Sequence, residues 1–367
     1  MYENDNRIVL TLDAGGTNFI FSAIQGNRAI TPPFHLPAVP NDINGCLDAL
    51  LKGFNHLIGA IGQQPTAISF AFPGPADYKH GIIGDLPNFP AFRGGIALGP
   101  FLEHHFKLPV FIENDGNLFA YGEALSGALP LINHSLQEKG NPTRYQNLIG
   151  LTLGTGFGAG VVVDKRLLNG DNNCGGDVWL MRNKKYPDFI AEESVSIRGI
   201  LRIYKELSHE KTERATPKEI YDIAEGKLDG NPKAAIAAFH ELGEIAGNVI
   251  AGVLNIVDGI VVIGGGLFGA EKYILPSILT ELHSELHSFR GTRFPCVQMR
   301  VFNWENPAER ELFLQSETQT VYIPRSNETV PYQHEKKTAI MRCKNDTSHS
   351  IMLGAYAFAL NNIDSAK

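Results

Sequence analysis

The chain has 367 residues, 43% of them hydrophobic and 19% charged, which is typical of a folded globular protein and argues against a disordered one. Its formal net charge is −7 and no long basic run occurs, which argues against a non-specific nucleic-acid surface. The start, MYENDNRIVL, lacks the positive segment of a secretory signal, and the most apolar stretch is broken by Asp258 and several glycines, so no membrane-spanning helix is expected. The four scattered cysteines form no CxxC pair, so we expect reduced thiols in a cytoplasmic protein.

The first half of the sequence alternates predicted strands and helices. A strand at 7–13 leads through Gly-Gly to a second strand around Phe19 to Ile24. Apolar residues at helical spacing predict a helix over 43–62, and TAISFAF predicts a strand over 66–72. LPVFIEND at 108–115 is a further strand, followed by the helical pattern GNLFAYGEALSG.

The second half repeats this plan after a polar stretch at 133–147. Residues 148–163 read as strand, turn and strand, 232–257 as a long helix, and 259–266 as a strand opening into another helix. The sequence at 291–343 is less regular, and SIMLGAYAFAL near the end is a short apolar helix. Strands alternating with helices predict an α/β fold with two related halves.

Two similar turns carry the strongest chemical signal: LTLDAGGTN at 10–18 and LTLGTGFGA at 151–159. Each runs from an apolar strand into glycines, whose backbone N–H groups can point into one concavity and bind phosphate. Glycine is needed where a Cβ would block that approach. A plain hairpin is the alternative for either turn alone, but the recurrence favours phosphate. The predicted phosphate-binding residues are Gly15, Gly16, Thr17, Thr155 and Gly156.

An acid stands beside only the first turn. The Asp13 carboxylate would repel phosphate unless a cation lay between them, and Mg²⁺ is the hard cation that bridges phosphates. In the second turn Gly154 takes that place, so this turn can bind phosphate without metal. A third glycine run offers bare backbone to adenine or ribose, with tight strand-to-helix packing as the alternative. Its residues are Gly264, Gly265 and Gly266.

A catalytic base is predicted in FIENDGN. Asp115 lies where a strand ends and a helix starts, and its carboxylate could accept the proton of a hydroxyl that attacks the γ-phosphate. The alternative is that Asn114 or Asp115 simply caps the helix. Asn114, and Asn88 in LPNFP, carry amides suited to vicinal sugar hydroxyls, although asparagine is also an ordinary turn residue.

Taken together, these motifs resemble the ROK family of bacterial sugar kinases, within the actin, sugar kinase and Hsp70 superfamily. The matching pieces, in order over most of residues 7–270, are LDAGGTN, AFPGPAD, LPNFP, ENDGN, LTLGTGFGAG and VVIGGGLF. The resemblance implies a two-lobed actin-like ATPase (ribonuclease H-like) α/β fold with the active-site cleft between the lobes. We expect a small lobe of 1–112 plus 351–367 and a large lobe of 113–350.

The resemblance implies an ATP-dependent hexose kinase, with glucokinase as the leading expectation. ATP and Mg²⁺ would be required, the chain would form a homodimer, and neither nucleic acid nor membrane would be a partner. By position, Asp115 corresponds to the catalytic base, and Gly74, Asn88 and Asn114 to the sugar pocket, while Asp13 would hold Mg²⁺ directly or through water. Kinases for fructose, mannose, allose or an N-acetylhexosamine stay open, as does a catalytically weak sugar-sensing regulator.

The sequence departs from the family pattern where sugar is recognised. The family's AGEIGH motif corresponds to CGGDVW at 174–179, with Gly176 for the sugar-binding Glu and Trp179 for the His. Asp177 could substitute for that Glu, and Glu192 falls where a second sugar-contacting Glu is expected. The zinc loop is replaced by LMRNKKYPDF, without cysteine or histidine, so no zinc site is expected.

Two other classes were weighed. Regulators of the family carry an N-terminal helix-turn-helix, and only six residues precede the first strand here. An actin- or chaperone-like ATPase would share the phosphate turns, but LPNFP and AFPGPAD match the sugar kinases instead. The roles of the insertions at 131–147 and 303–338 are not predicted.

Overall fold

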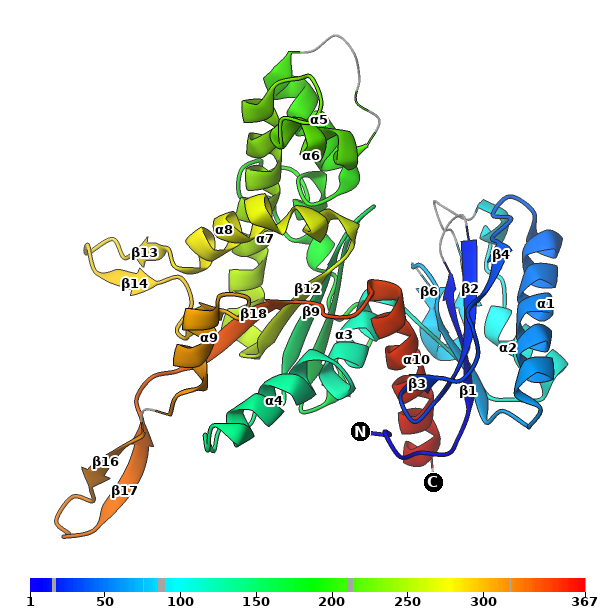
Figure 1. Cartoon of the computed structure of the whole chain (residues 1–367), viewed down its shortest axis with the longest axis horizontal. Coiled ribbons are helices and arrows are strands. Elements are labelled where there is room, and N and C mark those ends of the chain that lie inside the picture. The colour runs from blue at the N-terminus through cyan, green and yellow to red at the C-terminus, as the bar shows by residue number, and fades with distance from the viewer. Residues whose placement is uncertain are drawn as a thin grey trace. The chain divides into compact units, whose positions relative to one another are not determined.

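The structure, a computed structural model, describes residues 1–14, 18–74, 76–84, 90–209, 214, 216–316 and 318–366. The chain forms two compact units (Figure 1). The first unit comprises Met1–Gly127, Gly160–Gly176 and Lys344–Lys367, and the second comprises Ala128–Ala159 and Asp177–Cys343. These bounds differ from the lobes expected from the sequence, because 113–127 and 160–176 pack with the first unit.

The first unit is built on a sheet with the strand order β3-β2-β1-β5-β8, and β4 pairs with β2. β1 pairs antiparallel with β2, whereas β1, β5 and β8 run parallel. The carboxyl ends of these three parallel strands therefore meet at one edge. The strands are β1 (Val9–Ala14), β2 (Asn18–Gln25), β3 (Arg28–Ala29), β4 (Phe34–Pro37), β5 (Ala67–Ala71) and β8 (Val110–Glu113).

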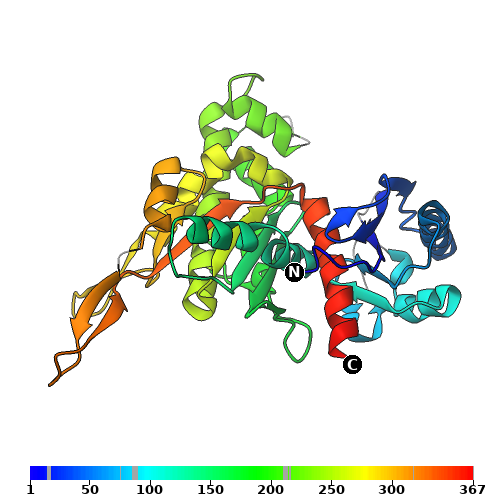
Figure 2. The same cartoon turned by 60° about the horizontal axis from the view of Figure 1, so that its bottom comes forward.

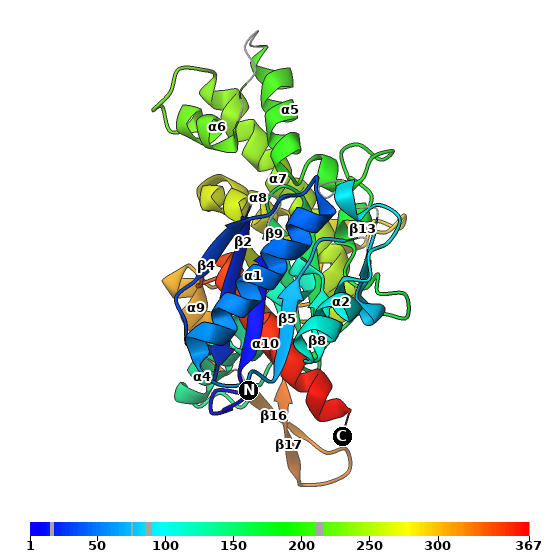
Figure 3. The ribbon, with the colours of Figure 1, turned by 90° about the vertical axis from the view of Figure 1, so that its right-hand side faces the viewer.

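Helices cover both faces of this sheet (Figure 2 and Figure 3). Along β1 the side chains alternate between the faces: Leu10 and Leu12 join the core that includes α1 and α2, and Val9 joins the core that includes α10. α10 also packs along α3. The helices are α1 (Ile43–Ile61), α2 (Leu98–Phe106), α3 (Asp115–Leu125) and α10 (Thr347–Ser365).

α3 and α10 cross at two glycines. A Cβ on Gly122 would collide with the Ser350 carbonyl oxygen, and a Cβ on Gly354 would collide with the Leu118 carbonyl oxygen. The backbones can come this close only because neither residue has a side chain. This crossing fixes α3, and with it the first turn that carries Asp115, on the sheet.

The second unit contains the sheet ordered β11-β10-β9-β12-β18-β15, of which β9, β12, β18 and β15 run parallel. β10 and β11 form an antiparallel pair at one end, in residues that belong to the first unit. The strands are β9 (Leu148–Leu153), β10 (Phe157–Val163), β11 (Arg166–Leu167), β12 (Ile260–Gly264), β15 (Arg300–Asn303) and β18 (Lys337–Arg342).

The 26-residue helix α7 supplies the largest share of this unit's core. It packs closely on α8, since Cβ atoms on Gly243 and Gly247 would meet the backbone of Ile274 and Ile278. α5 and α6 pack on α7 on its other side (Figure 1). The helices are α4 (Ala128–Glu138), α5 (Ile197–Ser208), α6 (Pro217–Ala224), α7 (Pro232–Val257), α8 (Glu271–Leu282) and α9 (Pro307–Leu314).

Short two-stranded ribbons and 3₁₀ turns complete the fold. The ribbon of β16 (Thr318–Tyr322) and β17 (Thr329–Gln333) extends away from the second unit's sheet (Figure 2, orange). The other short strands are β6 (Ala76–Asp77), β7 (Ile82–Ile83), β13 (Glu285–His287) and β14 (Arg293–Pro295). The 3₁₀ turns are η1 (Tyr78–His80), η2 (Pro90–Phe92), η3 (Val178–Leu180), η4 (Ala191–Glu193) and η5 (Gly266–Ala270).

The two insertions left without a role by the sequence pack against each other. Lys139 forms an ion pair with Glu311 at 2.6 Å, and the buried amide of Asn141 donates to the Leu314 carbonyl at 3.0 Å. The ring of Tyr145 stacks on Phe313 with centroids 5.6 Å apart. The segments 131–147 and 303–338 therefore form one substructure of the second unit.

The sequence predicted the most periodic elements correctly. The polar stretch at 133–147, for which the sequence predicted no helix or strand, is helical as far as Glu138. Within the described residues, no helix is long and apolar enough to cross a membrane. The confirmed elements include the strands at 7–13, 66–72, 108–115 and 148–163 and the helices at 43–62 and 232–257.

Candidate functional site

Two acids expected to act together lie at the same edge of the first sheet. Asp13, near the end of β1, is in register with Ala71 of β5, which is in register with Glu113 at the end of β8. Asp115 follows two residues later as the first residue of α3. The parallel register therefore gathers the predicted magnesium ligand and the predicted base, which are 102 residues apart by number, at one edge.

The residue that caps α3 is not the residue predicted to be the catalytic base. The Asn114 side chain caps α3, accepting from the backbone N–H of Gly116 at 2.9 Å and of Asn117 at 3.4 Å. Asp115 accepts from the Gly116 N–H at 2.9 Å with one carboxylate oxygen and is exposed to solvent. Because Asn114 already supplies the cap, the Asp115 carboxylate stays available for chemistry.

The pKa values of Asp13 and Asp115 are both raised above the ordinary value for aspartate. Loss of hydration around the carboxyl is the main cause of the raised pKa of Asp115; the hydrogen bond from the Gly116 N–H partly offsets it, and the negative charge of Asp13 raises the pKa further. Burial is also the main cause of the raised pKa of Asp13, which a hydrogen bond with Ser348 at the start of α10 partly offsets. Raised pKa values in neighbouring carboxylates are typical of functional sites.

A buried glutamate that the sequence reasoning missed supports this edge. Glu113 is 1% exposed and accepts from the Asn114 backbone N–H at 2.9 Å, the Asn117 amide at 3.0 Å and the Asn169 amide at 2.7 Å. Burial is the main cause of its raised pKa. Glu113 thus ties the first turn of α3 to the 160–176 segment. Its partner Asn169 is 56 positions away, so no local pattern could have shown this.

Gly74, expected in the sugar pocket, lies beside the hydroxyl of Tyr78. A Cβ on Gly74 would stand 2.8 Å from that oxygen. The Tyr78 hydroxyl donates to the Phe72 carbonyl at 3.0 Å and accepts from the Asn114 amide at 3.5 Å. Tyr78, which the sequence reasoning also missed, therefore links the turn after β5 to the Asn114 side chain.

In the second unit, the predicted phosphate turn joins β9 to β10. Its loop is closed by the Gly154 N–H, which donates to the Gly156 carbonyl at 3.1 Å. The Thr155 side chain at the tip is exposed. A Cβ on Gly156 would stand 2.6 Å from the Glu192 carboxylate. Glycine at this position therefore makes room for the Glu192 carboxylate in the place that it occupies here.

Glu192, expected to contact sugar, lies against that turn. One carboxylate oxygen accepts from the Phe157 backbone N–H at 2.8 Å, and the other accepts from the Arg198 guanidinium at 2.7 Å. The backbone carbonyl of Glu192 accepts from the Ser196 hydroxyl at 2.7 Å. This acid, half-buried, is thus held at the glycine turn by three defined contacts.

The residues that replace the family's sugar-binding motif are ordered around η3. Asp177 is exposed, at the start of that turn, and accepts from the Trp179 indole N–H at 3.2 Å. Trp179 is half-buried and packs partly on the main core of the second unit. Packing on this core therefore accounts for part of the buried surface of Trp179. Gly176 has a positive φ of 91°, a backbone conformation that favours glycine.

The three glycines of the third run, Gly264, Gly265 and Gly266, have different surroundings. Gly265 has a φ of 92° and packs against the Leu153 backbone, which fits the alternative that this glycine serves tight packing and not ligand binding. Gly266 opens η5, and a Cβ there would meet no atom within 4 Å. Gly264 is the last residue of β12 and pairs with Thr152 of β9. Gly266 is therefore the one of the three whose surroundings leave room for a ligand.

Some predicted residues lie outside the described part of the chain: Gly15, Gly16, Thr17 and Asn88. Among the residues that are described, no group of three or more His, Cys, Asp or Glu is arranged to hold a metal ion. The half-buried Asp13 carboxylate fits an Mg²⁺ held through water and substrate oxygens, which needs only one or two protein carboxylates. The absence of a zinc site stays a prediction.

Comparisons with known proteins fit this arrangement. The chain is similar to a crystal structure of glucokinase from Parabacteroides distasonis, 54% identical, with 98% of this chain and 99% of that one covered and a TM-score of 0.86. A glucokinase from Streptomyces griseus, solved with glucose and AMPPNP, is 18% identical, with 96% and 98% covered and a TM-score of 0.60, which supports the fold alone. The curated N-acetyl-D-glucosamine kinase of Vibrio parahaemolyticus is 26% identical over 318 residues, 77% of this chain and 97% of that protein.

These similarities confirm the expected two-lobed actin-like ATPase fold and the expectation of a sugar kinase. The model of the ROK family matches residues 9–306, from the start of β1 to the residue before α9. The chain therefore belongs to the ROK family.

Proposed function

We propose that this protein is an ATP-dependent hexose kinase, with glucose as the first candidate substrate. The observation that carries the proposal is Asp115, an exposed carboxylate of raised pKa at the sheet edge that also holds Asp13. The similarity to glucokinase from Parabacteroides distasonis supports glucose, and the similarity to an N-acetyl-D-glucosamine kinase keeps that sugar as the second candidate.

In the proposed reaction a sugar hydroxyl attacks the γ-phosphorus of ATP. The new bond joins the sugar oxygen to phosphorus, the bond from the γ-phosphorus to the bridging oxygen breaks, and ADP leaves with the electron pair. The hydroxyl proton passes to a carboxylate oxygen of Asp115. ATP supplies the phosphoryl group, and a Mg²⁺ ion held near Asp13 would neutralise phosphate charge.

The other site residues are proposed to bind and orient the sugar and ATP. We propose that Gly74, Asn88 and Asn114 contact sugar, and that Asp177 and Glu192 do so as well. Thr155 and Gly156 would bind phosphate together with Gly15, Gly16 and Thr17, and Gly266 would face the nucleoside beside Gly264 and Gly265. Glu113 and Tyr78 hold Asn114 in place through the contacts given above. Substrate orientation of this kind supplies much of the rate in phosphoryl transfer.

We also propose that the protein forms a homodimer and acts in the cytoplasm. ATP and a hexose would be its small-molecule partners. Size-exclusion chromatography with light scattering tests the dimer directly. A monomer at assay concentration would contradict that part of the proposal and leave the chemistry untouched.

The test is an ADP-release assay with ATP, Mg²⁺ and a panel of glucose, fructose, mannose, allose, N-acetylglucosamine and N-acetylmannosamine. Turnover with one sugar is expected, and Asp115→Asn should lower kcat by about 10²–10⁴ on the general-base scale. Asp48→Asn, on the exposed face of α1, is the matched control and should keep full activity. No turnover with any sugar, alongside calorimetric sugar binding, would instead indicate a sugar-sensing regulator.

A further inference from the structure

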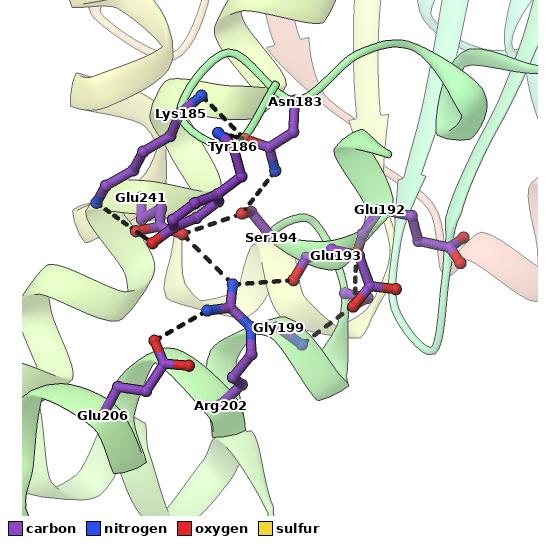
Figure 4. A network of polar contacts seen from close by, with 11 residues as sticks. Asn183, Lys185, Tyr186, Glu192, Glu193, Ser194, Gly199, Arg202, Glu206 and Glu241 are labelled. Atoms are coloured by element: carbon purple, nitrogen blue, oxygen red, sulfur yellow. Dashed lines mark hydrogen bonds and ion pairs between the residues drawn. The ribbon is translucent and has the colours of Figure 1, made fainter. Parts of the chain in front are cut away.

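Glu241 is a buried acid with no place in the proposed chemistry. It lies in the middle of α7, is 3% exposed, and has Leu242 and Ile245 of the hydrophobic core as neighbours on its helix. A lone ionised carboxylate in such a position would be costly, because burial removes its hydration. Its surroundings therefore have to supply partners, and Figure 4 shows that they do.

Four side chains from two other segments converge on the Glu241 carboxylate (Figure 4). The Ser194 hydroxyl donates to one oxygen at 3.0 Å, and the Arg202 guanidinium lies 3.7 Å from the same oxygen. Lys185 donates to the other oxygen, which also accepts from the Tyr186 hydroxyl at 3.4 Å. Burial is the largest single effect on the pKa of Lys185 and lowers it, but the hydrogen bond and charge of Glu241, with smaller contributions from Tyr186 and Glu244, together raise that pKa above its ordinary value.

A buried asparagine extends this cluster into the loop before η4. The Asn183 amide donates to the Ser194 hydroxyl at 2.9 Å, and its carbonyl oxygen accepts from the backbone N–H of Lys185 at 3.0 Å and of Tyr186 at 3.1 Å. Asn183 and Ser194 are both fully buried. The loop is thus folded around one polar centre whose negative charge comes from α7.

The same cluster reaches the segment that carries Glu192. Ser194 stands two residues after Glu192, and the Arg202 guanidinium donates to the Glu193 carbonyl at 3.3 Å (Figure 4). Glu192 in turn accepts from the Phe157 N–H, and the Ile197 N–H donates to the Gly154 carbonyl at 2.9 Å. Two backbone groups on either side of the glycine turn are therefore held by the 192–197 segment.

We propose that Glu241 is a positioning residue: through Ser194 and Arg202 it holds the 192–197 segment against the 154–157 turn, and so sets the geometry of the proposed phosphate site. The inference rests on the proposed function only for its kinetic readout. Glu241 is buried, so its effect on the turn would be passed on by the contacts that Glu192 and Ile197 make with Phe157 and Gly154.

The first variant is Glu241→Gln, which keeps the side-chain shape and removes the charge that Lys185 and Arg202 share. Because misplacing a phosphate-binding turn by even an ångström is costly, kcat/KM for ATP should fall about 10- to 100-fold. Ser194→Ala removes only the link to the segment and should act in the same direction, and the double variant should lose less than the product of the two effects. Glu244→Gln is the matched control, since Glu244 pairs with Lys184 on the exposed side of α7 and should leave the constants unchanged.

The second readout does not depend on activity. Hydrogen exchange of the peptide covering 154–158 should be faster in Glu241→Gln and Ser194→Ala than in the wild type or in Glu244→Gln, because the Phe157 N–H loses its fixed acceptor. Both measurements are made well below the Tm of each variant, so that loss of global stability does not enter.

The outcomes separate the inference from the proposed function. If the wild type phosphorylates a sugar but Glu241→Gln and Ser194→Ala lower only the Tm, with unchanged kcat, KM and exchange, Glu241 is a purely structural residue and the inference is wrong. If the wild type phosphorylates no sugar, the proposed function fails, and the exchange measurement alone decides the inference. Faster exchange at 154–158 supports it and unchanged exchange overturns it.

Discussion

At Asp115 the requirements of function and of stability oppose each other. A proton acceptor must be ionised, whereas burial and the charge of Asp13 raise its pKa and so favour the protonated form. The activity should therefore decline as the pH falls through a midpoint above about 3.9, the ordinary value for aspartate. The measurement is kcat/KM for the sugar against pH, with ATP saturating. An acid limb centred at the ordinary value would contradict the environment described for this carboxyl.

The same shift makes a prediction about stability. A carboxyl whose folded-state pKa is raised binds its proton more tightly in the folded state, so its charge at neutral pH disfavours folding. Asp115→Asn removes that charge and keeps an oxygen for the Gly116 N–H. Its Tm should therefore exceed that of the wild type at pH about 7, and the difference should shrink as the pH is lowered through the raised pKa.

Differential scanning fluorimetry over a pH series gives this comparison, with Asp48→Asn as the control that should follow the wild type at every pH. A lower Tm for Asp115→Asn at neutral pH would mean that the carboxylate stabilises the fold, and the interpretation of its environment would then be wrong.

At the residue scale the sequence identified the groups that stand inside motifs and missed those that support them. Asp115 and Asn114 stand out because strand, turn and helix signals meet at ENDGN. Glu113 was missed because its burial depends on Asn169, and Glu241 because its partners come from the loop at 183–194 and from α5. Buried polar residues are recognised by what they contact, and those contacts are long-range.

At the scale of elements, the crossing of α3 on α10 limits what the site can tolerate. Gly122→Ala puts a methyl group onto the Ser350 carbonyl, so the helices must separate, and the free energy of unfolding should fall by about 1–3 kcal/mol or more. Since α3 carries Asp115, kcat should fall as well. The control is Gly59→Ala in α1, where a Cβ meets nothing within 4 Å.

Chemical denaturation gives the free energy of unfolding for both alanine variants. Gly59→Ala should be neutral or stabilising by up to about 1 kcal/mol, because alanine is the better helix former. If Gly122→Ala were as stable as Gly59→Ala, the close crossing would not be a determinant of this unit.

The predictability of the elements follows from their patterns. α1 and α7 were predicted because their apolar residues recur at helical spacing over 19 and 26 residues. α4 was missed because polar side chains such as His134 and Glu138 dominate its exposed face, and Pro130 lies in its first turn. α5 and α9 were also missed, since they are short and bury only one stripe against the rest of the second unit.

At the scale of the whole molecule, the doubled strand-turn-strand pattern predicted two related halves, and the described residues form one sheet that contains β1 and β2 and another that contains β9 and β10. The division of the chain between the units was beyond the sequence, because it depends on where 113–127 and 160–176 find their packing partners. The sugar motif expected from the family resemblance also names no substrate, since the sequence is expected to depart from it at Gly176 and Trp179. Substrate choice therefore has to be measured.

The last prediction concerns the metal content of the whole protein. Asn183, Ser194 and Glu241, with Lys185 and Arg202, hold the loop at 181–191 by hydrogen bonds and ion pairs, without a cysteine or histidine in it. A loop organised in this way needs no zinc to fold. We expect elemental analysis to find far less than one zinc per chain, and a chelator to leave the Tm unchanged while stopping phosphorylation, which Mg²⁺ alone should restore. One tightly bound zinc per chain, or a Tm that drops on chelation, would show that a metal and not this network organises the loop.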